Sequence, residues 1–125
     1  MKSKTKKAGR ENRRHKRFRV REGALAFLGS VPGTITDISQ GGISVNYVVF
    51  EKDPDQVLKL DIFFSAGDFY LPGIPGRIVS DEDYPSEAPF SAVQVKRLGI
   101  QFGELTSEQE ASLKYFLLHN TISEA

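Results

Sequence analysis

The sequence of 125 residues contains no cysteine. This absence excludes disulfide bonds, thiol catalysis and cysteine-ligated zinc sites together. Long apolar runs are also missing, since none approaches the roughly 18 residues that a membrane-spanning helix needs. No hydrophobic stretch follows the basic N-terminus in the manner of a secretory signal. The sequence therefore predicts a cytoplasmic protein that does not insert into a membrane.

Signals of enzymatic activity are equally scarce. His15 and His119 are the only histidines, and no acidic residue lies at a spacing from them that would suggest a metal site. Ser39 lacks a Gly-x-Ser-x-Gly context, and no Gly-x-x-x-x-Gly-Lys phosphate-binding loop occurs. We therefore expect no catalytic activity, no metal and no cofactor, and we expect both histidines to lie at the surface.

Positive charge is concentrated at the N-terminus. Residues 1–22 hold eleven lysines and arginines against two glutamates, a balance of +9, whereas the rest of the chain holds six basic and fourteen acidic residues, a balance of −8. The first twelve residues have almost no apolar side chains and are predicted to be a flexible basic arm. A basic arm on an acidic body is typical of a segment that meets a polyanion or folds back onto its own domain.

The remainder has the composition of one globular domain, with 39% hydrophobic and 26% charged residues in the whole chain. From Ala24 onward, apolar residues recur with a period near two, as in strands that bury one face. Turn-forming residues at 31–33, 53–55, 66–68 and 80–86 separate the runs. Such short strands predict an antiparallel barrel or sandwich. The expected strands are 23–29, 33–39, 42–49, 57–66, 69–80 and 90–103.

Only the C-terminal region has a helical pattern. Residues 106–110 offer two overlapping capping boxes, and Leu113, Phe116 and Leu117 form an apolar stripe. The spacing predicts a helix over 107–119 that closes one opening of a barrel. We expect the domain to span 13–119, preceded by the arm at 1–12 and followed by a C-terminal tail at 120–125.

The segment Arg-Arg-His-Lys-Arg at 13–17 places arginines four residues apart. The guanidinium groups of Arg13 and Arg17 present donors that match a phosphate or the O6 and N7 acceptors of guanine. Arg14 lies beside them and can assist. The spacing alone is a weak signal, because Arg10 with Arg14 and Arg17 with Arg21 match it as well.

The segment Asp-Ile-Ser-Gln-Gly-Gly at 37–42 lies between two expected strands. An ionised Asp37 accepts hydrogen bonds and so complements the N1 and N2 donors of guanine, while Ser39 can donate or accept. Gly41 and Gly42 permit positive φ angles and a close approach of ligand to backbone. The alternative is an ordinary hairpin in which Asp37 caps its own turn.

The two segments together, with an expected all-β domain closed by one helix, resemble the PilZ family over about residues 11–119. Gly-Arg-Ile-Val at 76–79 and Arg-Leu-Gly-Ile-Gln-Phe at 97–102 extend the resemblance. It implies a six-stranded antiparallel barrel whose Arg-x-x-x-Arg and Asp-x-Ser-x-x-Gly motifs bind cyclic di-GMP, with the arm folding over the ligand. The residues that match these motifs are Arg13, Arg17, Asp37, Ser39 and Gly42.

Three functions remain open at this stage. The first is a receptor without catalytic activity that binds cyclic di-GMP and signals to a protein effector through ordering of the arm. The second is a small barrel that binds nucleic acid through the basic arm, which the acidic body disfavours. The third is an adaptor of the same fold that acts through protein contacts alone.

Overall fold

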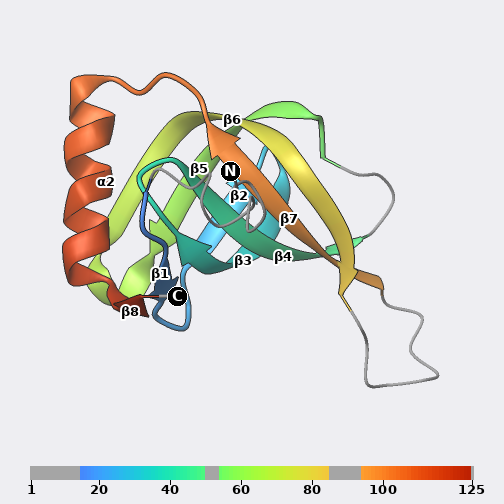
Figure 1. Cartoon of the computed structure of the whole chain (residues 1–125), viewed down its shortest axis with the longest axis horizontal. Coiled ribbons are helices and arrows are strands. Elements are labelled where there is room, and N and C mark those ends of the chain that lie inside the picture. The colour runs from blue at the N-terminus through green and yellow to red at the C-terminus, as the bar shows by residue number, and fades with distance from the viewer. Residues whose placement is uncertain (1–14, 50–53, 85–93, 125) are drawn as a thin grey trace, which may run out of the picture.

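Eight strands and one α-helix form the part of the chain that the computed structural model describes, namely residues 15–49, 54–84 and 94–124. Figure 1 shows their arrangement. In chain order the elements are β1 (Phe18–Val20), β2 (Leu25–Leu28), β3 (Val31–Ile38), β4 (Gly42–Val49), β5 (Val57–Phe64), the short 3-10 helix η1 (Ser65–Gly67), β6 (Phe69–Tyr84), β7 (Gln94–Phe102), α2 (Ser107–His119) and β8 (Thr121–Glu124).

Six of the strands close into an antiparallel barrel. Neighbouring strands follow the order β2, β5, β6, β7, β4 and β3, and a further pairing between β2 and β3 closes the ring. The remaining two strands extend the sheet outside the ring, because β1 pairs with β3 and β8 pairs with β1. The predicted six-stranded barrel with one C-terminal helix is confirmed.

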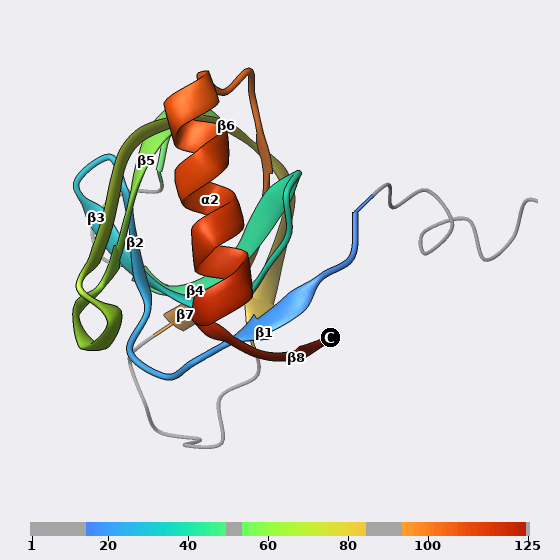
Figure 2. The ribbon, with the colours of Figure 1, turned by 90° about the vertical axis from the view of Figure 1, so that its left-hand side faces the viewer.

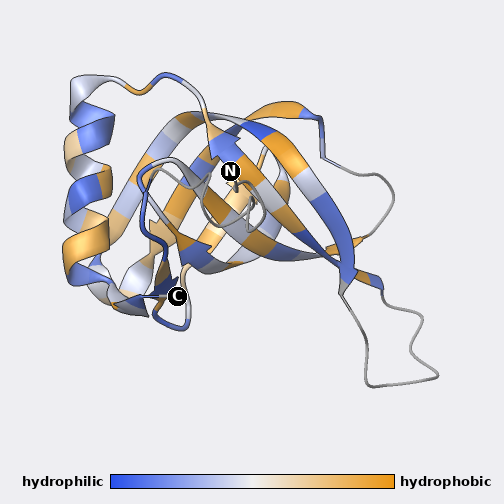
Figure 3. Ribbon diagram, in the orientation of Figure 1, coloured by the Kyte–Doolittle hydropathy of each residue, from blue (hydrophilic) through white to orange (hydrophobic). Residues whose placement is uncertain are grey.

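The barrel interior is filled by alternate residues of each strand. In β5, Leu60, Ile62 and Phe64 are buried, whereas Asp61 and Phe63 between them are more exposed and face outward. Figure 3 shows the same alternation of hydrophobic and hydrophilic residues along the other strands. Each fully buried aliphatic or aromatic side chain contributes about 1.5–3 kcal/mol to folding. The barrel is therefore stabilised mainly by this apolar interior.

Helix α2 covers one opening of the barrel (Figure 2). The Thr106 hydroxyl accepts a hydrogen bond from the Gln109 amide, and the Gln109 side chain accepts one from the Thr106 amide, each at 3.0 Å. Leu113 and Phe116 are buried, and the Phe116 ring centroid lies 4.8 Å from that of Phe69 at the start of β6. The helix spans the predicted range 107–119. No helix in the described part of the chain is long and apolar enough to cross a membrane.

The turn expected at 31–33 belongs to β3, so that prediction is wrong. Leu28 pairs directly with Val31, which leaves Gly29 and Ser30 as a two-residue hairpin turn. Gly29 has a φ of 68°, the left-handed conformation that such turns favour. The hairpin therefore turns earlier than the Val-Pro-Gly sequence suggests.

The turn expected at 80–86 is also misplaced, because β6 continues to Tyr84. Its acidic residues face a basic pair on β7, and Lys96 Nζ lies 3.4 Å from Asp81. Opposite charges on neighbouring strands stabilise pairing, which explains how an acidic run can be a strand. Residues 90–93 of the strand expected at 90–103, and residue 53 of an expected turn, lie outside the described residues.

The sequence predicts neither β1 nor β8. Both strands are short, with three and four residues, so no alternating pattern identifies them. Thr121–Glu124 was expected to be part of a C-terminal tail, but it forms β8 and pairs with β1. The N-terminal and C-terminal ends of the described chain are therefore joined in one sheet.

Replacing Phe116 by alanine is expected to destabilise the domain by about 3–5 kcal/mol, because the ring is fully buried against Phe64 and Phe69. Leu118→Ala on the same helix is the control, since Leu118 is 79% exposed and its loss should change stability by less than about 0.5 kcal/mol. Denaturant titration of both variants measures the difference. Equal midpoints for the two variants would show that α2 does not seal the barrel.

Candidate functional site

The connection between β3 and β4 is a tight turn organised by Ser39. The Ser39 hydroxyl oxygen accepts hydrogen bonds from the amides of Gly41, at 3.0 Å, and Gly42, at 3.2 Å. The Ser39 amide in turn donates to the Gly42 carbonyl at 2.8 Å. Ser39 is 7% exposed. The turn is therefore held by Ser39, and not by Asp37 as the ordinary-hairpin alternative supposed.

The sequence indicates that Gly41 and Gly42 permit positive φ angles, but neither residue adopts one, since the positive-φ glycines of the described residues all lie elsewhere. Gly42 is needed for packing instead, since a Cβ atom there would lie 2.5 Å from the carbonyl oxygen of Ile100 on β7. At Gly41 a Cβ atom would meet the ring of His15 at 2.8 Å.

A β-bulge sets the direction of Asp37. Ile35 and Asp37 pair with consecutive residues of β4, so Thr36 is an extra residue, and its hydroxyl donates to the Ser44 carbonyl at 3.2 Å. In a regular strand without the bulge, Ile35 and Asp37 would be two residues apart on the same inward face. The bulge reverses the phase, so Ile38 is fully buried and Asp37 faces the outside of the barrel.

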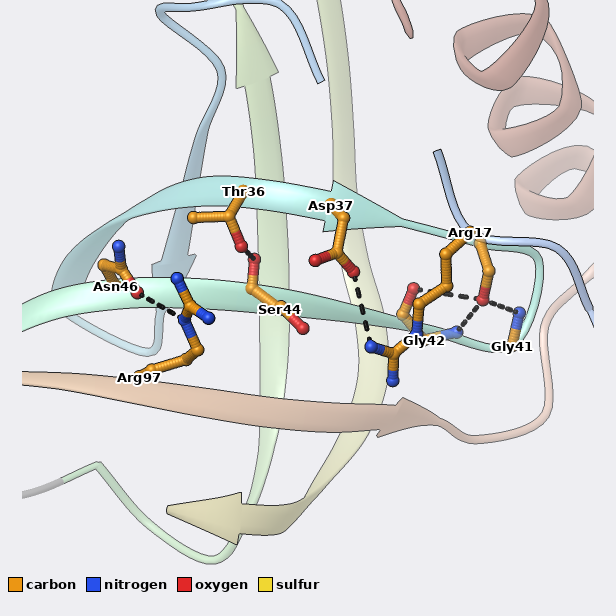
Figure 4. Close-up of polar contacts among 9 residues, drawn as sticks. Arg17, Thr36, Asp37, Gly41, Gly42, Ser44, Asn46 and Arg97 are labelled. Carbon is orange, nitrogen blue, oxygen red and sulfur yellow. Dashed lines mark hydrogen bonds and ion pairs between the residues drawn. The ribbon is translucent and has the colours of Figure 1, made fainter. Parts of the chain in front are cut away.

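Strand β1 brings Arg17 to this turn. Phe18 pairs with Ile38 and Arg19 pairs with Asp37. Arg17, the residue before Phe18, therefore lies beside the start of the turn. Arg17 Nη1 lies 3.7 Å from Asp37 Oδ1, as Figure 4 shows. The two sequence motifs thus meet in space through this ion pair. Their other arginines, Arg13 and Arg14, lie outside the described residues.

A row of small polar residues forms the floor of a groove next to the turn. Asp37, Ser44, Gly99 and Ser80 are direct neighbours on four adjacent strands. A Cβ atom at Gly99 would collide with the Ser80 hydroxyl, so the floor is flat there. The groove has a volume of about 1070 Å³. It is thus as large as the upper range for small-molecule sites, about 300–1,000 Å³.

Two residues that the sequence did not single out also line this groove. Arg97 on β7 is held by a hydrogen bond from its Nε to Asn46 Oδ1 at 3.2 Å (Figure 4). His15 is exposed, as predicted, yet its ring lies against Gly41 at the groove wall. Strand alternation could have identified Arg97, since its neighbour Leu98 is buried. No sequence signal distinguishes His15 from other residues of a basic arm.

The groove wall carries more negative than positive charge. Among the described residues that line it, four carboxylates face two arginines, so a dianionic ligand needs further positive charge. No cluster of three or more potential metal ligands occurs among the residues of known placement. The charged residues of the groove are Arg17, Arg97, Asp37, Glu82, Glu104 and Glu110.

The chain thus folds into a small closed β-barrel with one capping helix and a polar groove on its outer wall. The family model of the PilZ domain matches residues 11–119. The chain therefore belongs to the PilZ family, as the motifs indicated. No curated protein matches the chain in sequence.

Solved PilZ structures share the fold at low sequence identity. The PilZ domain of YcgR from Escherichia coli with c-di-GMP has a TM-score of 0.65 at 13% identity, covering 86% of this chain and 89% of that one. The MrkH–c-di-GMP complex of K. pneumonia has a TM-score of 0.66 at 16% identity, covering 86% and 51%. Another MrkH structure, described as a c-di-GMP-dependent transcription regulatory factor, gives 0.63 at 17% identity, covering 86% and 50%. The chain thus spans about half the length of MrkH.

The two glycines of the turn should respond differently to alanine. Gly42→Ala is expected to cost about 1–3 kcal/mol of stability, because its Cβ would press on the rigid backbone of β7. Gly41→Ala should be nearly neutral for stability, because the His15 ring that it meets is exposed and can rotate away. Thermal and denaturant unfolding of both variants checks this. A Gly42→Ala variant as stable as the parent would contradict the packing role.

Proposed function

We propose that the protein is a receptor without catalytic activity for cyclic di-GMP, which binds in the groove beside the turn at 37–42. The observation that carries this proposal is the ion pair between Arg17 and Asp37, 3.7 Å apart. This pair brings an arginine of the Arg-x-x-x-Arg motif to the Asp-x-Ser-x-x-Gly motif on a PilZ fold. Relatives with this fold were solved with c-di-GMP bound, which supports the same ligand here.

The ligand carries two phosphodiester charges and two guanines on one compact ring. Arg13 and Arg17 bind its phosphates or guanine edges with bidentate, charge-assisted hydrogen bonds. Arg14 assists them. Because carboxylates outnumber arginines in the described groove, the N-terminal segment with its balance of +9 supplies the missing charge. This division explains why charge is so unevenly distributed along the chain.

The turn reads the guanine. The Asp37 carboxylate, 22% exposed at its side chain, accepts hydrogen bonds from the N1 and N2 donors of the base. The Ser39 oxygen already accepts two backbone amide hydrogens, and its own hydrogen makes only a long bond of 3.5 Å to the Gly42 carbonyl, so Ser39 turns this hydrogen to the ligand as a donor. Gly41 and Gly42 have no side chains, so the ligand can approach the backbone at this wall of the groove. Ser39 thus has two roles, since it holds the turn and also contacts the base.

The signal is the ordering of the arm over the barrel. The ligand fixes the arginines of residues 13–17 against the turn at 37–42 and so changes the outer surface that a protein effector meets. The barrel interior has little part in this change, because Ile43 and Ile100 are the only residues of the buried apolar core, within the described chain, that line the groove. The mechanism needs no catalytic group, metal or cofactor.

Nucleic-acid binding is the second candidate function. The basic N-terminal segment favours it, because Lys and Arg neutralise phosphates of any sequence. The four carboxylates in the described groove disfavour it, since they repel a polyanion. An adaptor role without ligand is less favoured, because the positions of both motifs are occupied by the expected residues.

Arg17→Ala and Arg13→Ala should each weaken binding of cyclic di-GMP about tenfold or more, because each removes a charge-assisted contact of about 1.5–3 kcal/mol. Isothermal titration calorimetry measures this loss. Lysine at either position should restore only part of the affinity, since it lacks the planar fork.

Arg21→Ala is the matched control for this series. It removes the same charge at a position that fits the alternative Arg17–Arg21 spacing but does not line the groove. Its affinity should equal that of the parent. A loss at Arg21 with none at Arg13 would place the motif in the other register. An oligonucleotide that binds as tightly as cyclic di-GMP, with a steep loss in salt, would instead favour the nucleic-acid function.

Amide hydrogen exchange should locate the change on binding. Protection is expected to rise at residues 10–22 and 35–44, because hydrogen bonds to the ligand hold these segments together. The strands at 57–64 and 94–102 should change little, since they belong to the barrel that stays fixed. Equal exchange of residues 10–22 with and without saturating cyclic di-GMP would contradict the proposed signal.

A further inference from the structure

A second groove lies on the other side of the N-terminal segment, between that segment and helix α2. It has a volume of about 560 Å³. Figure 2 shows β1 and the residues before it passing the C-terminal end of α2. One wall comes from the N-terminal segment, the other from the helix, and the turn after β3 contributes a single residue. The lining residues are His15, Lys16, Phe18, Gln40, Lys114, Leu117 and Leu118.

The groove and the helix surface beside it expose apolar side chains that are not needed to fill the barrel core. Leu118 is 79% exposed, although the helix already buries Leu113 and Phe116 against the barrel. Tyr115, one turn earlier, and Ile122 in β8 are 54% and 64% exposed. A concave apolar site rimmed by polar groups is typical of protein interaction surfaces.

The charge of this groove is positive. Its lining includes Lys16 and Lys114, and no carboxylate among the described residues lines it. Lys16 Nζ lies 4.0 Å from Oε1 of Glu124 in β8, and both side chains are more than half exposed. Such an exposed pair is weak, so an incoming carboxylate can replace Glu124 at little cost. This groove therefore differs in sign from the ligand groove, where carboxylates predominate.

The two grooves share a wall. His15 and Gln40 line both of them. His15 packs against Gly41 of the turn. Arg17 directly precedes Phe18, the first residue of β1. Whatever holds the segment at 15–18 against the turn therefore also holds one side of the second groove.

We propose that this second groove is the docking site for a partner protein segment whose apolar side chains are flanked by carboxylates, and that its affinity rises when the ligand groove is filled. Leu117, Leu118 and Phe18 receive the apolar anchors, and Lys16 and Lys114 pair with the carboxylates. The coupling, but not the docking, rests on the proposed binding of cyclic di-GMP. The concave shape favours an inserted side chain over a flat lipid surface.

The test is a selection of short random peptides displayed on phage against the full chain saturated with cyclic di-GMP. Selected peptides should be enriched in Leu, Ile or Phe together with Asp and Glu. By fluorescence anisotropy, Leu118→Glu and Lys114→Glu should each weaken the best peptide about tenfold, as loss of an anchor does. Val57→Glu is the matched control, since Val57 is an exposed apolar residue of β5, 68% exposed, outside both grooves.

Peptides that bind Leu118→Glu as well as the parent, or that show no acidic enrichment, would overturn the docking proposal. If no peptide is selected and the protein sediments with phosphatidylglycerol vesicles, but Leu118→Glu does not, the occupant is a membrane. That result would also overturn the docking proposal. A dimer that Leu118→Glu dissociates in light scattering would identify a second copy of the chain and overturn it likewise.

Coupling is measured with the same peptide. Its affinity should rise about fivefold or more when cyclic di-GMP is added, and cyclic di-GMP should gain the same factor from the peptide. Calorimetry of cyclic di-GMP alone separates the two hypotheses. No heat of binding would reject the proposed function and leave the docking result standing. Binding of both ligands without mutual effect would reject the coupling.

Discussion

The edge of β3 that faces away from β4 is the constraint on which the rest of the structure depends. The first half of this edge pairs with β2 and closes the barrel, and its second half pairs with β1. Since both strands use the same edge, the chain between them must leave the sheet and return. Gly23, with a φ of 99°, lies in that connection, in a conformation that L-residues rarely adopt. The barrel and the candidate site are thus built on one strand.

The sequence predicts those features that repeat over many residues. The six barrel strands have period two, and helix α2 has both a capping box and an apolar stripe, so its predicted range agrees with the structure. The strand β1 offers only Phe18–Val20 within a basic run, too few residues for any period. The turn at 29–30 is hidden for another reason, because Val-Pro-Gly directly after it is a stronger turn signal.

The candidate site is predictable in its residues but not in its geometry. Motif spacing identifies Arg17, Asp37 and Ser39, yet Asp37 faces outward only because Thr36 is an extra residue in β3. A bulge depends on the register with β4, which no local pattern encodes. The need for Gly42 is likewise a long-range effect, since the clashing atom belongs to β7. The sequence alone explains Gly42 by backbone conformation and by close approach of a ligand, because it does not show this contact with β7.

The distribution of charge gives the N-terminal segment a role on both of its sides. Toward the barrel it faces a groove rich in carboxylates, which attract its arginines, as the ion pair between Arg17 and Asp37 shows. Toward α2 the same segment contributes His15 and Lys16 to a positive, apolar groove. Strand β1 lies between β3 and β8, so it is fixed at both edges and cannot move without disturbing one of them. Residues just before β1 are held less firmly, by the ion pair of Arg17 with Asp37 on one side and by the exposed pair of Lys16 with Glu124 on the other. In the proposed mechanism, a ligand that strengthens the first of these contacts acts on the same segment that forms the wall of the second groove.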